Sequence, residues 1–123
     1  MTLRTTAAAV ILLIAGATSV HAGPVTLLSA GLDSEGGAMT CHVMNGGKKT
    51  VESISVVIAP VTQPDNGSSS TCEQVAAGAG CPVTLGVGSA GSYFCKVTIS
   101  KGSKKDFRAS FCDVASGNCS EAR

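Results

Sequence analysis

Residues 93–100 read YFCKVTIS, and this run decides the fold. Apolar and polar side chains alternate along it, so one face carries Tyr93, Cys95, Val97 and Ile99. Because successive side chains of a β-strand point to opposite faces of the sheet, the alternation predicts a strand with this apolar face buried. Cys95 is then directed into the core.

The same two-residue period recurs along most of the chain. Apolar faces are formed by Met39, Cys41 and Val43, by Ile54, Val56 and Ile58, and by Phe107, Ala109 and Phe111. Shorter β-like runs lie at residues 25–29, 71–75 and 82–87. Turn-forming residues at 101–104 predict a hairpin between residues 93–100 and 107–111. About seven short strands without a helical stripe predict an all-β, two-sheet sandwich.

The N-terminal segment has the pattern of a cleavable secretory signal. Arg4 precedes an apolar run at residues 7–17, and residues 20–22 read VHA, a small-residue cleavage pattern. The apolar run is too short to cross a bilayer as a helix. We therefore expect residues 1–22 to be a signal peptide. Residues 23–123 are then a single β-sandwich domain, secreted or periplasmic, with no membrane segment after cleavage.

All six cysteines lie downstream of this segment: Cys41, Cys72, Cys81, Cys95, Cys112 and Cys119. An even number of cysteines in a short exported chain indicates disulfides formed in an oxidising compartment. Cys41 and Cys95 lie on the apolar faces of their predicted strands and therefore point toward the core. This strand parity favours a bridge between the two sheets. Cys112 faces away from the core and lies one turn before Cys119, which favours a local bridge, and elimination pairs the remaining two. Other arrangements of three bridges remain open at the level of the sequence.

The approach to Cys95 carries a resemblance. Residues 91–95 read GSYFC and follow a run that alternates Val83, Leu85 and Val87. This approach resembles that to the second cysteine of immunoglobulin-like domains, in which a tyrosine two residues earlier forms a corner. The resemblance covers residues 38–112 and implies an immunoglobulin-like sandwich, although the usual tryptophan is absent and Ser89 replaces the usual acidic residue. The layout is also similar to that of small exported bacterial β-sandwich proteins of unknown function, and neither resemblance transfers a functional residue.

The charges of the expected mature chain cancel. Without Arg4, eight Lys and Arg residues stand against eight Asp and Glu residues. Nucleic-acid and anionic-membrane binders use excess positive charge to neutralise phosphates, so we expect neither class of partner. Lys48 and Lys49 form a local basic pair, and a larger cluster contains Lys101, Lys104, Lys105 and Arg108. We interpret both groups as solvated turns or a blunted sheet edge.

Few side chains are suited to catalysis. His42 is the histidine that remains after signal cleavage, and cysteines in disulfides supply no thiol nucleophile. Asp33, Glu35 and Glu52 have no partner at an informative spacing. We therefore expect neither an enzyme nor a cofactor.

The segment His42-Val43-Met44 places an imidazole and a thioether on one face of a strand. It resembles a short pattern of periplasmic copper carriers, and soft sulfur ligands suit Cu(I). Those carriers use further His and Met ligands, whereas Met39 here faces the other side of the strand. The prediction is therefore no metal site, with periplasmic copper binding as an alternative function.

Together these features predict an exported, non-catalytic binding or structural module that contacts another protein through an edge strand or loops. The longest polar loop, residues 62–71, is the segment we expect to be mobile or in contact. The other alternative is an inhibitor of secreted hydrolases, with residues 73–80 between Cys72 and Cys81 as its reactive loop. Inhibitor loops are rigid, whereas the Ala and Gly content of residues 76–80 predicts flexibility.

Overall fold

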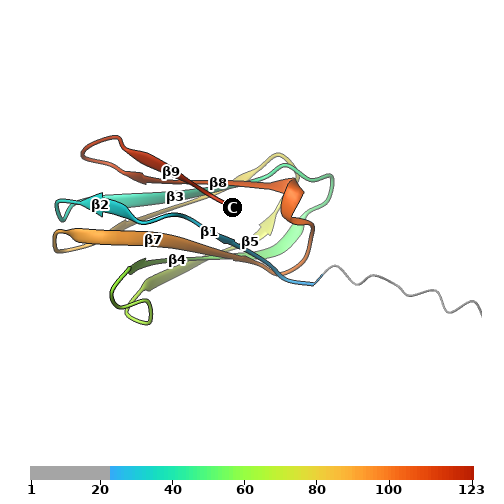
Figure 1. The fold of residues 1–123 in the computed structure, drawn as a ribbon. Coiled ribbons are helices and arrows are strands. Elements are labelled where there is room, and N and C mark those ends of the chain that lie inside the picture. The colour runs from blue at the N-terminus through green and yellow to red at the C-terminus, as the bar shows by residue number, and fades with distance from the viewer. Residues whose placement is uncertain (1–22) are drawn as a thin grey trace, which may run out of the picture.

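The computed structural model describes residues 23–123 and holds nine strands in two layers (Figure 1). The strands are β1 (Val25–Leu28), β2 (Leu32–Ser34), β3 (Ala38–Asn45), β4 (Val51–Pro60), β5 (Ser68–Val75), β6 (Gly80–Gly86), β7 (Gly91–Ile99), β8 (Phe107–Asp113) and β9 (Cys119–Ala122). A 3-10 turn, η1 (Lys104–Asp106), precedes β8. The expected signal peptide, residues 1–22, lies outside the described residues. In the described part, no helix is long and apolar enough to span a membrane.

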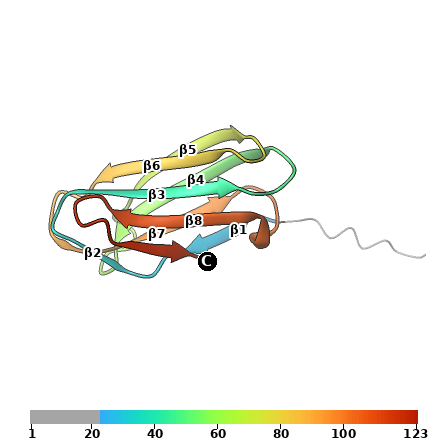
Figure 2. The ribbon, with the colours of Figure 1, turned by 90° about the horizontal axis from the view of Figure 1, so that it is seen from above.

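The strands form two antiparallel sheets. The first sheet has the order β1-β7-β4-β5, with β2 also paired to β7, and the second has the order β6-β3-β8-β9. Figure 2 looks onto the second sheet, with β6, β3 and β8 side by side. The predicted all-β, two-sheet fold is confirmed. The strand count exceeds the prediction because β2 and β9, of three and four residues, are too short to show an alternating pattern.

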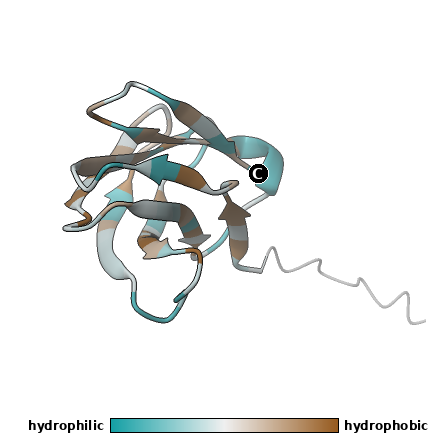
Figure 3. Cartoon of the chain, turned by 60° about the vertical axis from the view of Figure 1, so that its left-hand side comes forward, coloured by the Kyte–Doolittle hydropathy of each residue, from teal (hydrophilic) through white to brown (hydrophobic). Residues whose placement is uncertain are grey.

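The core lies between the two sheets and is built from the faces that alternation predicts. Its fully buried side chains include Met39, Cys41 and Val43 of β3, Ile54 and Val56 of β4, and Cys95, Val97 and Ile99 of β7. Phe111 is the largest of the fully buried side chains. Burying a side chain of this kind stabilises the fold by roughly 1.5–3 kcal/mol. Hydrophilic residues lie instead on η1 and on the loop between β4 and β5 (Figure 3).

The predicted hairpin between residues 93–100 and 107–111 is wrong. β7 lies in the first sheet beside β4 and β1, whereas β8 lies in the second sheet between β3 and β9. The connection between them contains η1 and Gly102, whose φ of 146° favours glycine, and it crosses from one sheet to the other. A Cβ at Gly102 would also lie 2.8 Å from the Phe107 ring. Alternation predicted the buried faces of both strands, but it carries no information on which sheet each strand joins.

Three disulfides join the cysteines in the pairs that strand parity and elimination favour. The bridges are Cys41–Cys95 between β3 and β7, Cys72–Cys81 between β5 and β6, and Cys112–Cys119 between β8 and β9. The first two connect one sheet to the other. On the loop-entropy model the core bridge contributes about 4 kcal/mol, and each short-range bridge contributes about 2 to 3 kcal/mol. Three disulfides in a domain of this size indicate an oxidising environment.

Tyr93 forms a corner at the start of β7. Its hydroxyl donates a hydrogen bond to the carbonyl oxygen of Ser89 at 2.7 Å and lies 3.1 Å from that of Val87. The Tyr93 side chain is buried, so these contacts satisfy its polar end at the rim of the core. They hold the loop between β6 and β7 against the first sheet.

Candidate functional site

The edges of the two sheets differ in how far they are closed. An edge strand presents unpaired backbone N–H and C=O groups, which are a template for pairing with another chain. The end strands of the two sheets are β1, β5, β6 and β9, and β8 also reaches an edge where β9 ends. The three residues of β2, which pairs only with β7, form a further, short edge.

The edges at β1 and β9 close each other. The N–H of Leu28 donates to the carbonyl oxygen of Arg123 at 3.0 Å, and the N–H of Arg123 donates to that of Leu28 at 3.2 Å. A further bridge joins Ser29 to Ala122. These hydrogen bonds join the two sheets at the ends of β1 and β9.

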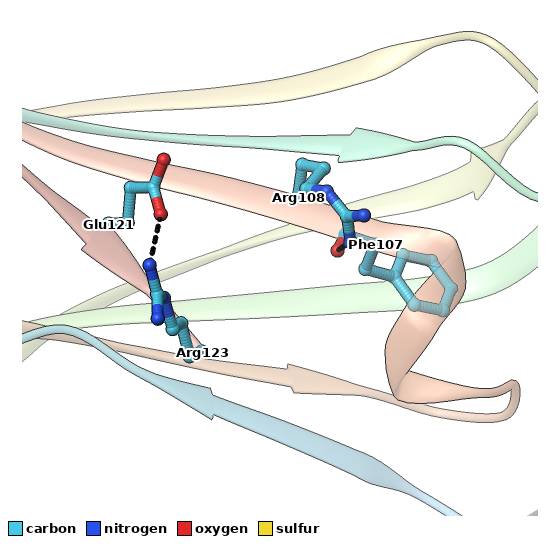
Figure 4. A network of polar contacts seen from close by, with 4 residues as sticks. All are labelled: Phe107, Arg108, Glu121 and Arg123. Carbon is cyan, nitrogen blue, oxygen red and sulfur yellow. Dashed lines mark hydrogen bonds and ion pairs between the residues drawn. The ribbon is translucent and has the colours of Figure 1, made fainter.

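Where β9 ends, β8 closes its own edge. The N–H of Asp113 donates a hydrogen bond to the carbonyl oxygen of Asn118, on the β9 side, at 2.9 Å. Backbone groups of successive residues in a strand point to opposite sides, so every second residue from Asp113, including Phe107, directs its backbone groups to the β9 side. The N–H of Phe107 donates to the carbonyl oxygen of Lys104. Its carbonyl oxygen accepts a hydrogen bond from Nη1 of Arg108 at 3.0 Å (Figure 4). Neither backbone group of Phe107 is left for a partner strand.

Pro82 protects the edge at β6. The N–H of Asn45 on β3 donates to the carbonyl oxygen of Ala79 at 3.0 Å. The backbone groups of Ala79 therefore face β3. Because backbone groups of successive residues point to opposite sides of a strand, those of Pro82 and Thr84 face away from β3. Because proline has no N–H, the edge lacks a donor at this position, which disfavours the addition of a strand.

The edge at β5 stays open. The carbonyl oxygen of Ser53 on β4 accepts a hydrogen bond at 3.0 Å from the N–H of Ser100, which directly follows β7, so the backbone groups of Ser53 face the β7 side. Backbone groups change sides at each residue of a strand, so the backbone groups of Val56, three residues after Ser53, face β5. There Val56 is paired with Ser70. The N–H and C=O groups of the neighbouring residues, Ser69 and Thr71, consequently point away from the sheet. Among residues 23–123, no strand pairs with β5 on this side.

The open part of β5 lacks the usual protections of an edge. Residues 68–71 read SSST, and all four are exposed, uncharged and not proline. Further along, the pairing of β5 with β4 is interrupted at Gln74, whose φ of 51° lies in the left-handed region and which is not paired with Glu52. Cys72, bonded to Cys81 on β6, anchors the strand between these two parts. The result is a neutral, hydroxyl-rich strand edge.

The open edge was not predicted from the sequence, because residues 62–71 were expected to form a polar loop. The loop is exposed as expected, but it ends at Gly67, and β5 begins at Ser68. A Cβ at Gly67 would lie 2.6 Å from Cγ1 of Val57 and 2.8 Å from Cβ of Ala59. Glycine thus lets the chain pack against β4 and start the strand at once. A run of serines gives no alternating pattern, so the β-like run predicted at residues 71–75 covers only the second part of β5.

The turn between β5 and β6 is held by Asn45, which is only 1% exposed. The side-chain amide of Asn45 donates to the carbonyl oxygens of Lys49 at 2.9 Å and Val75 at 3.0 Å. The main-chain carbonyl oxygen of Asn45 accepts a hydrogen bond from the N–H of Gly78 at 2.7 Å. The sequence predicted a flexible turn here, whereas these hydrogen bonds fix both ends of it.

A shallow groove of about 670 Å³ lies beside β8 and β9. Its positively charged lining residues are Lys104, Lys105, Arg108 and Arg123. Glu121 also lines the groove and pairs with Arg123 at 3.1 Å, but both side chains are exposed, so this ion pair stabilises little. Most of the predicted basic cluster therefore surrounds the groove, and Arg108 blunts the β8 edge as that prediction proposed.

His42 and Met44 lie on the outer face of β3 and lean over Gly80 of the neighbouring strand β6. A Cβ at Gly80 would clash with Nε2 of His42 and lie 2.9 Å from Sδ of Met44. Met39 is fully buried on the opposite face, as the sequence predicted. Across residues 23–123, no cluster of three or more His, Cys, Asp or Glu side chains is placed to hold a metal ion.

The carboxylates considered as catalytic candidates are not assembled into a site. Asp33 lies on β2, Glu35 follows that strand, and Glu52 lies on β4. All three are exposed.

The buried carboxylate is Asp113, which sequence analysis did not single out. It accepts hydrogen bonds from the hydroxyl of Ser34 at 3.0 Å and from the N–H of Ser116 at 3.0 Å. Hydrogen bonding by the Ser116 hydroxyl, then by the Ser116 N–H, lowers the pKa of Asp113 below its usual value despite burial. These contacts tie β2 to the turn between β8 and β9, which is a structural role.

Comparisons of the chain with protein-family models, with curated proteins and with solved structures find no match. The geometry itself therefore carries the functional argument. Its main features are an open edge at β5, a fixed β5–β6 turn and a paired imidazole and thioether on β3.

Proposed function

We propose that the protein is an exported, non-catalytic binding module that holds an extended segment of a partner protein against β5. The observation that carries this proposal is the outward direction of the backbone groups of Ser69 and Thr71. Among the four end strands of the sheets, β5 is the one that has neither a proline nor a backbone hydrogen bond to the opposite sheet. An extended segment laid along it would exchange backbone hydrogen bonds with these residues and add a strand to the first sheet.

Side chains beside this edge define what the partner segment would meet. Thr71 lies opposite Ser55, and Ser69 lies opposite Val57, on the outer face of the first sheet. These side chains are small and uncharged, so backbone pairing would supply most of the affinity and selection for charge would be weak. Small or β-branched residues in the partner suit such a flat surface.

An immunoglobulin-like architecture and an exported location belong to the same proposal. The core disulfide between strands of opposite sheets and the corner at Tyr93 support the first. The placement of β7 and β8 in different sheets is a departure, because in an immunoglobulin domain the strand that carries the second cysteine and the strand that follows it lie in one sheet. The three disulfides support a secreted or periplasmic location.

A hydrolase inhibitor is the second candidate, and the observation that favours it is the hold of Asn45 on the β5–β6 turn. Residues 76–78 of that turn are exposed, so they are accessible to an enzyme. The test is a panel of serine, cysteine and metallo-hydrolases assayed with excess protein. Full activity of the whole panel would exclude this candidate.

Strand addition at β5 is tested by comparing Ser69→Pro with Ser69→Ala. Proline removes the outward N–H without removing a hydrogen bond to β4, whereas alanine removes only the hydroxyl. The mature protein and both variants are used as bait in the secreted fraction of the native cells. We expect wild type and Ser69→Ala to retain the same partner and Ser69→Pro to lose it.

Amide hydrogen exchange supplies the direct signature of strand pairing. Binding of the partner should slow exchange at Ser69 and Thr71, while Thr84 at the β6 edge serves as an internal control. Equal retention by both variants, or unchanged exchange at Ser69 and Thr71 in the complex, would contradict docking at β5.

A further inference from the structure

The groove beside β8 and β9 opens where the end of β9 leaves β8. Ala122, the last residue of β9, is paired with Ala109 on β8. The next residue, Arg123, exchanges both backbone hydrogen bonds with Leu28 at the end of β1, in the opposite sheet. The chain therefore turns away from β8 at this point. Residues on both sides of the divergence line the groove of about 670 Å³.

Cations line the groove from both sides. Lys104, Lys105 and Arg108 belong to η1 and the start of β8. Arg123 lines the groove from the end of β9, and Figure 4 shows its side chain and that of Arg108 on separate segments. Glu121 is the acidic side chain among the lining residues. Four cations against one carboxylate leave a local excess of three positive charges, although the charges of residues 23–123 cancel.

The Arg108 guanidinium is held in place by the backbone. Its Nη1 donates to the carbonyl oxygens of Phe107 at 3.0 Å and Lys105 at 3.2 Å. Nε and Nη2 of Arg108 make no hydrogen bond to other groups of residues 23–123, so both nitrogens are left to donate to a ligand. A guanidinium matches the geometry of a carboxylate, which can accept two parallel hydrogen bonds from it. Because the side chain is already ordered, binding costs less conformational entropy.

The kind of anion follows from the balance of charge and apolar surface. Apolar side chains also line the groove, among them Leu27, Phe107 and Ala109. Apolar surroundings reduce the screening of an ion pair by water. Nucleic acids and other polyanions are bound by neutralising many phosphates, which needs a larger excess of charge. A local excess of three charges beside apolar groups suits a few carboxylates on a partly apolar chain, which is the chemistry of an acidic peptide.

We propose that this groove binds an extended peptide segment that contains two consecutive acidic residues. Successive side chains of an extended peptide point to opposite sides. One carboxylate therefore meets Arg108 and the lysines of η1, and the next meets Arg123. Glu121 pairs with Arg123 at 3.1 Å, so the incoming carboxylate competes with Glu121. The groove lies beside β8 and β9, whereas β5 is an end strand of the other sheet, so this proposal does not depend on docking at β5.

The test uses an acetylated and amidated peptide, Ser-Ala-Glu-Glu-Ala-Ser, and a control peptide with glutamine in place of both glutamates. Each peptide is titrated into the mature protein with intact disulfides at low ionic strength, and backbone amide shifts are followed by NMR. Anionic lipid vesicles and a sulfated oligosaccharide are then added as competitors. These arms separate an acidic peptide from a membrane surface and from a polyanionic sugar.

Two double variants separate the groove from general surface charge. Lys104→Gln with Arg123→Gln removes one cation from each side of the groove, and both residues keep their backbone hydrogen bonds. Lys48→Gln with Lys49→Gln removes the same charge from the β3–β4 turn, where neither residue lines the groove.

Glu121→Gln tests the competition for Arg123 and should have the opposite effect. It removes the acidic side chain that lines the groove and releases Arg123, so the acidic peptide should bind about twofold more tightly. Glu52→Gln makes the same change of charge at an exposed position on β4, outside the groove, and should leave the affinity unchanged.

We expect the acidic peptide to shift the amides of Arg108, Ser110 and Glu121 and the glutamine peptide to leave them in place. The groove double variant should bind about fivefold more weakly, whereas the turn double variant should match wild type. The proposal is overturned by absence of these shifts, by equal binding of the two peptides, or by equal weakening in the two double variants. Displacement of the peptide by vesicles or by the oligosaccharide at equal charge concentration would also overturn it.

Discussion

Arg108 closes the edge of its own strand, because its Nη1 donates to the carbonyl oxygen of Phe107, the preceding residue, at 3.0 Å. The same nitrogen donates to the carbonyl oxygen of Lys105 at 3.2 Å. A side chain that the sequence marks only as one member of a basic cluster thus occupies the place of a missing strand. This relationship separates the β8 edge from the open edge at β5.

Replacing Arg108 with alanine should open the β8 edge. The free energy of unfolding should fall by about 1 kcal/mol through loss of the hydrogen bond, and the protein should self-associate at high concentration. Lys104→Ala is the control, because it removes the same charge from the groove without removing a donor to Phe107. Urea unfolding and sedimentation velocity measure the two effects. Indistinguishable behaviour of the two variants would mean that Arg108 does not protect the edge.

Removal of the core disulfide should cost more stability than removal of a short-range one. Replacing Cys41 and Cys95 by alanine should lower the free energy of unfolding by about 4 kcal/mol or more, because the closed loop is long. Replacing Cys112 and Cys119 should lower it by about 2 to 3 kcal/mol. Chemical unfolding of the two double variants makes the comparison. Equal losses would show that loop closure is not the dominant contribution of the core bridge.

Asp113 should make stability depend on pH in the acid range. Its pKa is lowered in the folded state by hydrogen bonds from Ser116 and Ser34, so the charged form favours folding. This contribution is complete above the ordinary pKa of 3.8 and is lost as the pH falls through the lowered value. Asp113→Asn should flatten the fall of the melting temperature in this range. Asp33→Asn, at an exposed position, should keep the wild-type dependence of melting temperature on pH. If Asp113→Asn also kept it, the acid sensitivity would come from other groups.

Asn45 should be required to hold the β5–β6 turn. Asn45→Ala removes hydrogen bonds to buried backbone groups and should lower the free energy of unfolding by about 2 to 3 kcal/mol. Because Oδ1 of Asn45 accepts from the N–H of Gly47 at 3.0 Å, amide exchange at Gly47 should accelerate. Asn66→Ala is the control, since the Asn66 side chain bonds only Gln63 at the exposed β4–β5 loop. A loss of stability no larger than that of Asn66→Ala would contradict the role of Asn45.

The sequence was sufficient to predict the buried faces of the strands and the pairing of the cysteines. Both depend on which face of its strand each side chain occupies, and this alternates from residue to residue. The position of Cys95 beside Val97 and Ile99 on an alternating strand is local information. It determines which side chains point inward whatever sheet the strand joins. Parity also separates Cys41 and Cys95 from Cys112, which leaves few compatible bridges.

Sheet order and edge protection could not be predicted in the same way. Whether β8 pairs with β7 or with β3 depends on the path of the chain at Gly102, which alternation does not describe. Pro82 protects an edge only because β6 is the outermost strand of its sheet, and His42 and Met44 lie over Gly80 only in the register that places Gly80 opposite Met44. These features arise from contacts between distant segments.

The bridge from Cys72 to Cys81 gives the open edge a mechanical property. An edge strand is ordinarily the first part of a sheet to peel away under load, because hydrogen bonds to a single neighbour hold it. β5 is also joined covalently to the opposite sheet, one residue beyond the exposed SSST segment. Tension applied along β5 by an attached partner would pass through this bond into β6 and the rest of the domain. The strand best placed to receive a partner is thus also one that cannot be stripped from the domain by breaking hydrogen bonds alone.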